Sequence, residues 1–301
     1  MIITEKKSKL VSYIIYVISA LILIIDHKTV LAGVSQGLYM CARYIIPSLF
    51  MMCIVSSVLI SSPYSENLFT SALSGLFGFE KNLGVCVFFG LIAGFPSGAI
   101  GAFALYENRT ICQRDCERAV YFTNNAGLAF IIGTVGTLMG SIKYAVILWL
   151  SQTLASLTLS NVFKTKNARA MPPKTPAQAQ IGLVEAVKKG AATMLTVCAF
   201  VCFFTSVRLL VEDALKSCID SKLMLSFTVS FLEIGNAVFS ASDLPKYSEI
   251  LCSFSVGFGG LSAILQSVAV CPCVKISRYF AARIMMGFLC VGYTYIISLI
   301  I

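Results

Sequence analysis

A single carboxylate interrupts the apolar segment at residues 223–241. Glu233 lies in the stretch LEIGN at 232–236. If this segment enters a membrane, an ionisable side chain there is costly and usually marks a pathway or a binding site. We therefore expect Glu233 to bind a cation, carry a proton or accept hydrogen bonds from a solute. The alternative is a protonated or arginine-paired carboxyl that only holds its segment together. Asn236, three residues on, shares its face if the stretch is helical.

Two adjacent carboxamides, Asn124 and Asn125, lie in a second apolar segment. An unpaired side-chain amide is costly in hydrocarbon. We therefore expect these two side chains to hydrogen-bond a polar solute or the broken backbone near Pro96. Hydrogen bonds that hold neighbouring helices together are an equally good explanation. Proline lacks a backbone donor and clashes with the preceding turn, so the chain can bend at 95–97. The residues predicted to bind substrate are Pro96, Ser97, Asn124, Asn125, Glu233 and Asn236.

The sequence lacks the arrangements that support catalysis. Ser97 has no histidine or aspartate beside it to activate a hydroxyl nucleophile, and neither a Walker-type loop nor a His-Glu-x-x-His motif occurs. Most of the 12 cysteines lie in apolar runs, where a thiol packs as a small hydrophobe. The pairs Cys112/Cys116 and Cys271/Cys273 are expected near water, but they have no histidine beside them. We predict no metal, no cofactor and no enzymatic activity.

These residues belong to a strongly apolar chain. Of its 301 residues 57% are hydrophobic and 12% are charged, about half the charged fraction of a soluble domain; the mean hydropathy is +0.86. Long apolar runs of this kind predict membrane-spanning helices in a lipid bilayer. The net charge of +9 then reflects basic residues in cytoplasmic loops, and we expect no nucleic-acid partner.

The apolar runs divide the chain into two halves. We predict an N-terminal anchor helix and loop at 1–37, a first repeat at 38–163, a basic cytoplasmic linker at 164–189 and a second repeat at 190–301. Cleavage of the first helix as a signal peptide is the alternative. Thr110 to Gln113 has the form of a capping box that would start a helix. The predicted apolar runs are 10–25, 38–61, 83–106, 119–139, 144–162, 190–211, 223–241, 250–271 and 279–301.

The distribution of basic residues conflicts with nine full crossings. With the N-terminus in the cytoplasm, nine crossings would place the basic linker outside. If 83–106 and 223–241 instead enter and return on the same face, 16 lysines and arginines are cytoplasmic and six are external. In that arrangement Lys275, Arg278 and Arg283 are cytoplasmic, whereas Arg208 extends toward the outer headgroups. Each leg of a folded 25-residue segment reaches about the midplane of the bilayer.

The two unusual segments also resemble each other. LIAGFPSGA at 91–99 can be aligned with LEIGNAVFS at 232–240, which pairs Gly94 with Gly235, and the helices that follow pair Gly127 with Gly259. Each half then has three crossings and one hairpin, so the second half is inverted. We predict an all-α polytopic membrane protein with about seven spanning helices and two re-entrant hairpins in an inverted repeat, an arrangement typical of secondary transporters.

Four stretches carry a family resemblance. GLIAGFPSGA at 90–99, YFTNNAGLAFIIGTVG at 121–136, LEIGN at 232–236 and VGFGGLSAILQS at 256–267 resemble, in order and spacing, the YlbJ-type sporulation integral membrane protein of the Gate, or nucleoside recognition, family. The resemblance implies a bacterial cytoplasmic membrane protein of spore-forming bacteria. It also implies a relation to FeoB-type iron transporters and to concentrative nucleoside transporters. Glycines stand at 257, 259 and 260 where nucleoside transporters carry acidic residues, so the resemblance does not imply a nucleoside substrate.

Together these features predict a transporter-like or channel-like protein that moves a small polar solute, with or without a coupling cation, in sporulation. The alternative is a non-transporting structural component of a sporulation or envelope complex. A homo-oligomer is compatible with either function.

Overall fold

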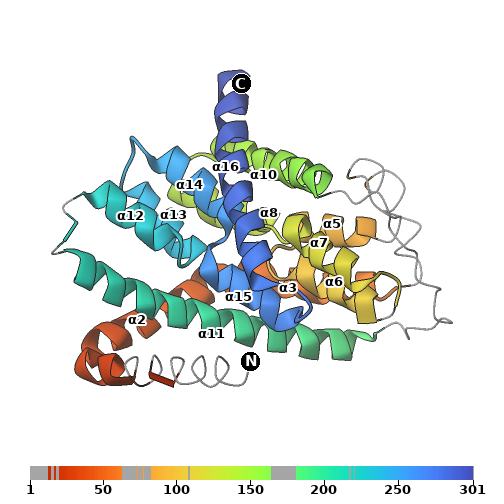
Figure 1. Ribbon diagram of the computed structural model, residues 1–301, viewed down its shortest axis with the longest axis horizontal. Coiled ribbons are helices and arrows are strands. Elements are labelled where there is room, and N and C mark those ends of the chain that lie inside the picture. Colours follow the sequence, from red (N-terminus) through yellow and green to blue (C-terminus); the bar gives the residue numbers. More distant parts are fainter. Residues whose placement is uncertain are drawn as a thin grey trace, which may run out of the picture.

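The computed structural model describes residues 13–14, 17, 20–62, 73, 77, 83–107, 109–163, 181–216, 218–219 and 221–300. Throughout these ranges the regular structure is helical, with no strand (Figure 1). Residues 10–12, 15–16 and 18–19 of the predicted anchor helix at 10–25 lie outside them, as do the linker residues 164–180. Residues 20–25, at the end of the predicted anchor, are helical.

Five helical segments in the described ranges are long and apolar enough to cross a bilayer. They are His27–Ile60, Ile142–Val162, Leu183–Lys216, Ser248–Val270 and Ile276–Ile300. A crossing needs about 20 predominantly apolar residues. By length and composition, this is a multi-pass helical membrane protein.

The first half begins with a long helix and ends with another. Helix α2 (His27–Met40) continues through the π-helical turn η1 (Cys41–Ile45) into α3 (Ile46–Ile60). Two short helices follow, α5 (Gly84–Ile92) and α6 (Ser97–Glu107), and they pack against each other. The next segment is interrupted; its parts are α7 (Gln113–Thr123), α8 (Leu128–Phe130), η3 (Ile131–Val135) and α9 (Gly136–Leu138), and α10 (Ile142–Val162) completes the half.

The second half has the same order of elements. A long helix, α11 (Leu183–Lys216), precedes the packed short pair α12 (Lys222–Ser230) and α13 (Ile234–Ser242). The interrupted segment that follows is α14 (Ser248–Phe258) and α15 (Gly260–Val270), and the last helix is α16 (Ile276–Ile300). In the first half, the segment predicted as one helix at 119–139 is broken, because residues 124–127 are not helical.

The first short pair is separated at Ala93–Pro96. Gly94 has φ +86° and a proline follows two residues later, so neither residue continues an α-helix. The Ser97 hydroxyl donates to the carbonyls of Phe89 at 3.0 Å and of Gly94 at 2.6 Å. A Cβ at Gly94 would lie 2.5 Å from the Gly127 nitrogen, so this turn packs directly against the break in the next segment.

The second short pair meets the second break in the same way. Gly260 has φ +82°, and a Cβ there would lie 3.0 Å from the Glu233 Cα. The first amides of α15 have no partner within their own helix. Leu261 and Ser262 donate theirs to the carbonyls of Phe231 at 2.8 Å and Leu232 at 3.0 Å. Each turn between short helices is thus held against a helix break in its own half.

The long helices pack across the halves. Helices α2 and α3 lie along α11, and α10 and α14 pack against α16 (Figure 1). A small apolar cluster joins the first group, with Ile45 and Leu49 against Val197 and Val201. A larger cluster fills the space among the short helices, the interrupted segments, α10 and α16.

Several hydrogen bonds connect the two halves, and four of them bear on which segments share a face of the membrane. The Ser61 hydroxyl accepts from the Ile181 amide at 3.3 Å, and Glu117 accepts from the Lys275 amide at 3.2 Å. Arg208 donates to Gln36 at 3.3 Å, and the Tyr144 hydroxyl donates to the Glu249 carbonyl at 2.9 Å. The two residues joined by each bond must lie at the same depth of any membrane that the protein spans.

Several local predictions are wrong. Helix α7 begins at Gln113 with Cys112 as its N-cap residue and with no side-chain cap, so Thr110 does not form a capping box. Residues 183–189 belong to α11 rather than to a linker. Arg208 is buried and paired with Glu212 at 3.0 Å rather than extended to headgroups. Arg283, counted among the basic residues of the cytoplasmic face, is 0% exposed within α16.

Candidate solute site between the two helix breaks

A cavity of about 50 Å³ lies where the two turns and the two breaks converge. Phe95 comes from the first turn, Ala126 and Gly127 from the break after α7, and Glu233 from the second turn. A water molecule needs about 10–15 Å³ of such volume, so the cavity has room for a few waters or a small cation. The other lining residues are Ile45, Leu49, Phe130, Val197, Val201, Ile234, Ser262, Ala263 and Gln266.

Glu233 is the carboxylate of this cavity. It is 2% exposed and is the N-cap residue of α13, where its Oε2 accepts from the Asn236 amide at 2.7 Å. A carboxylate at this position satisfies an amide that its own helix leaves free and interacts favourably with the helix dipole. No lysine or arginine nitrogen within the described ranges lies within 4.0 Å of it. The arginine-paired alternative therefore does not describe Glu233 in this structure.

Asn236 shares the first turn of α13 with Glu233. Its side-chain nitrogen donates to the Thr205 hydroxyl of α11 at 2.9 Å, whereas its Oδ1 is buried without a hydrogen-bond partner. An unsatisfied buried amide oxygen costs about 1–3 kcal/mol. This oxygen is an acceptor that a solute or a water could use, although Asn236 does not line the cavity itself.

Asn124 occupies the break between α7 and α8. Its side-chain nitrogen donates to Ser267 and, at 2.8 Å, to the Tyr279 hydroxyl. Its Oδ1 is also buried without a partner. Asn124 therefore ties the first-half break to α15 and α16 of the second half.

Both polar atoms of the Asn125 side chain have hydrogen-bond partners within the protein. Its side-chain nitrogen donates to the Phe122 carbonyl at 2.8 Å, and its oxygen accepts from the Ser156 hydroxyl at 3.1 Å. Gln152, one turn earlier on α10, both accepts from the Ala126 amide at 2.9 Å and donates to the Ala126 carbonyl at 3.0 Å. The backbone freed by this break is thus satisfied by Gln152 of α10. The bond between Asn125 and Ser156 connects the break to α10, which is the helix-joining role that was predicted as the alternative for the asparagines.

Of the six predicted site residues, Glu233 alone lines the cavity. Pro96 and Ser97 lie in the first turn and shape it. Asn124, Asn125 and Asn236 lie at the breaks and turns around the cavity, where their hydrogen bonds are structural.

Arg283 is a component of this region that the sequence did not reveal. Its guanidinium donates to the carbonyls of Phe258 at 2.9 Å, Asn124 at 2.8 Å and Gly257. These are carbonyls at the C-terminal ends of α14 and α7, where helix dipoles concentrate negative potential. The same group lies 5.1 Å from the centroid of the Phe95 ring, within cation–π range.

Gln266 and Ser262 supply the remaining polar groups of the cavity. The Gln266 side-chain nitrogen donates to the Ser262 hydroxyl at 3.0 Å, and both residues come from the first turns of α15. With Glu233 opposite apolar walls, the cavity offers one carboxylate and a few neutral oxygens. Oxygen ligands of this kind suit a hard cation or the hydrogen-bond donors of a small polar solute.

The chain was compared with protein-family models, with curated proteins and with solved structures, and none of the three comparisons gives a match.

Proposed function

We propose that the chain is a transporter-like or channel-like membrane protein that moves a small polar solute or cation. The observation that carries this proposal is the cavity at the convergence of both turns and both breaks, with the buried carboxylate of Glu233 on its wall. In transporters, broken helices meet near the bilayer midplane and use their freed backbone and polar side chains at the substrate site.

Part of the proposal concerns topology: two re-entrant hairpins, α5–α6 and α12–α13, in an inverted repeat. The four hydrogen bonds between halves support it. In the re-entrant arrangement, Ser61, Ile181, Glu117 and Lys275 all lie at the cytoplasmic face, and Gln36, Arg208, Tyr144 and Glu249 at the outer face. If all nine apolar runs crossed fully, each of these four bonds would join residues at opposite faces.

The same proposal assigns the protein to a bacterial cytoplasmic membrane, with its N-terminus in the cytoplasm. The resemblance to the YlbJ-type and Gate proteins remains a hypothesis that rests on sequence motifs.

The size of the cavity limits the solute. Since small-molecule sites typically enclose about 300–1,000 Å³, the cavity of about 50 Å³ favours a cation or a very small solute in this state. A larger solute would require the two turns to separate.

The test is transport by purified protein in liposomes. The substitution Glu233→Gln removes the charge and keeps the shape, and Asp243→Asn is the matched control because Asp243 is exposed at the end of α13. The probes are radiolabelled sodium, rubidium, uridine and glycine, with a pH-sensitive dye for protons. We expect uptake of at least one probe by wild type and by Asp243→Asn, and a loss of at least about tenfold in Glu233→Gln.

Two results would contradict the proposal. Uptake that is equal in wild type and Glu233→Gln would remove the carboxylate from the mechanism. An absence of any flux across the probes, with folded protein in the liposomes, would favour the alternative of a non-transporting component of a membrane complex.

A further inference from the structure

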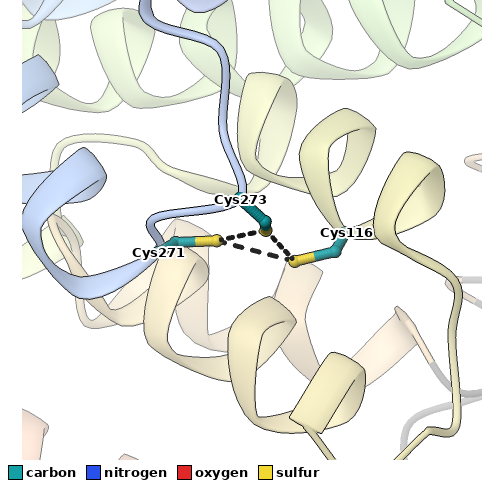
Figure 2. A group of neighbouring side chains, drawn as sticks. All are labelled: Cys116, Cys271 and Cys273. Carbon is teal, nitrogen blue, oxygen red and sulfur yellow. Dashed lines mark hydrogen bonds between the residues drawn. The ribbon is translucent and has the colours of Figure 1, made fainter.

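Three thiols meet at the junction of the two halves, away from the cavity. Cys116 lies in the first turns of α7, Cys271 is the C-cap residue of α15, and Cys273 lies in the loop before α16. Figure 2 shows their sulfurs pointing toward one another: 3.5 Å separates Cys116 from Cys271, and 3.2 Å separates Cys273 from each of the other two. Cys112, which is close to Cys116 in sequence, is not part of this group, and its thiol donates to Asp115 at 3.0 Å.

We propose that Cys116, Cys271 and Cys273 form a binding site for a soft d¹⁰ metal ion, zinc(II) or copper(I). Thiolates are the preferred ligands of both ions. Among the described residues, this is the one group of three or more potential ligand side chains with donor atoms within 4.8 Å of one another. The sulfurs come from two segments separated by more than a hundred residues, so their convergence is a tertiary feature rather than local packing.

The geometry fits such an ion after a small adjustment. With metal–sulfur bonds of about 2.3 Å, sulfurs in a trigonal or tetrahedral site lie about 3.8–4.0 Å apart. The three sulfurs would therefore have to separate by roughly half an ångström around the ion. Cys273 is half-buried in a loop and can supply most of this movement, whereas Cys116 and Cys271 are fully buried.

The loop that carries Cys271 and Cys273 is held against α7 by hydrogen bonds of Glu117. Glu117 accepts from the Lys275 amide at 3.2 Å and from Tyr121 at 2.9 Å, and its carboxylate lies 3.9 Å from Arg278. This fixes the loop and brings a basic side chain to it. The N-terminus of the 25-residue helix α16 follows Cys273 closely in sequence, and helix N-termini favour thiolates.

The ion would clamp the start of α7 to the α15–α16 loop and thus join the two halves at one face. Binding displaces the thiol protons. We therefore expect apparent metal affinity to rise with pH.

The experiment compares two triple variants of the full chain in detergent. One replaces Cys116, Cys271 and Cys273 with alanine, and the matched control replaces the buried cysteines Cys53, Cys86 and Cys252, which lie outside the cluster. Each reduced protein is titrated with zinc(II) and, anaerobically, with copper(I) against a competing chelator. We expect the wild type and the control variant each to bind one more ion per chain than the cluster variant. We also expect the bound ion to raise the Tm of the wild type and of the control variant.

X-ray absorption at the edge of the bound metal reports the sulfur ligands directly and identifies which ion is preferred. The single variant Cys273→Ala, at the half-buried position, covers the case in which the triple variant does not fold. Equal stoichiometry in both triple variants would overturn the proposal, as would a bound metal with no sulfur scattering. A Cys116–Cys273 or Cys271–Cys273 disulfide in protein alkylated during cell lysis would also overturn it.

Discussion

At the scale of single residues, polar side chains of the last long helix in each half satisfy the broken backbone. In the first half Gln152 bonds both backbone groups of Ala126, and Trp149 donates to the Leu91 carbonyl at 3.1 Å. In the second half Arg283 donates to the Phe258 and Gly257 carbonyls, and it also donates to the Asn124 carbonyl at the break of the first half. Water cannot do this in hydrocarbon, so a helix break persists there only where protein groups or a cavity take over its hydrogen bonds.

The buried hydrogen bonds of Arg283 predict a large loss of stability when this side chain is replaced. Arg283→Met keeps a long side chain but leaves three buried carbonyls without their donor, and each unsatisfied group costs about 1–3 kcal/mol. We expect a loss of at least about 3 kcal/mol in the free energy of unfolding, seen as a large fall in Tm in detergent. Arg278→Met is the control: its side chain is 64% exposed, so its salt bridge contributes at most about 1 kcal/mol. Equal Tm values for the two variants would contradict this role.

At the scale of elements, close contact between each turn and a helix break decides the architecture. Gly94 combines φ +86° with a position where a Cβ would lie 2.5 Å from the Gly127 nitrogen. Backbone cannot move aside as a flexible side chain can. The first turn and the first break therefore form one unit, which needs glycine on both sides.

Gly94→Ala tests this contact. Left-handed backbone costs about 1–2 kcal/mol for a non-glycine residue, and overpacking adds about 1–3 kcal/mol. We expect a destabilisation of about 2–5 kcal/mol by thermal unfolding in detergent. Gly133→Ala is the matched control, since it lies in η3 with nothing within 4 Å of the added methyl group. A Gly94→Ala protein as stable as Gly133→Ala would show that the contact is not required.

The sequence was sufficient to predict the helical class, the bend at 95–97 and the burial of the Glu233 side chain. A proline next to glycines and an isolated carboxylate in an apolar segment are local patterns that can be read without knowing the tertiary structure. The break at 124–127, the burial of Arg283 and the thiol cluster could not be predicted in this way. Each depends on a partner from the other half of the chain, such as the Asn124 carbonyl for Arg283 or Cys271 for Cys116.

The alignment of the two halves could also be predicted only in part from local sequence patterns. Gly127 and Gly259, which the sequence alignment pairs, are each the N-cap residue of the helix that follows a break. In the short pairs, however, the helix starts align Ser97 with Ile234, which is four positions from the predicted register. Apolar, glycine-rich segments carry little information on register, so the correspondence had to come from the helix ends.

At the scale of the whole molecule, the proposed topology determines which connections between helices lie on the same face of the membrane. The connections from α3 to α5, from α6 to α7 and from α15 to α16 should lie on one side of the membrane, and those from α11 to α12 and from α13 to α14 on the other. The thiol cluster and Glu117 connect two of the first group. Both short helical pairs would then enter from opposite faces and meet at the cavity.

Labelling of single cysteines in intact cells tests this claim most directly. In a cysteine-free background, one cysteine is placed at Glu66, Glu107, Asp213 or Lys246 and treated with an impermeant thiol reagent before and after permeabilisation. The account predicts that positions 66 and 107 react only after permeabilisation, whereas 213 and 246 react in intact cells. If 66 and 107, or 213 and 246, react from opposite faces, the short pair between them crosses the membrane and the account is wrong.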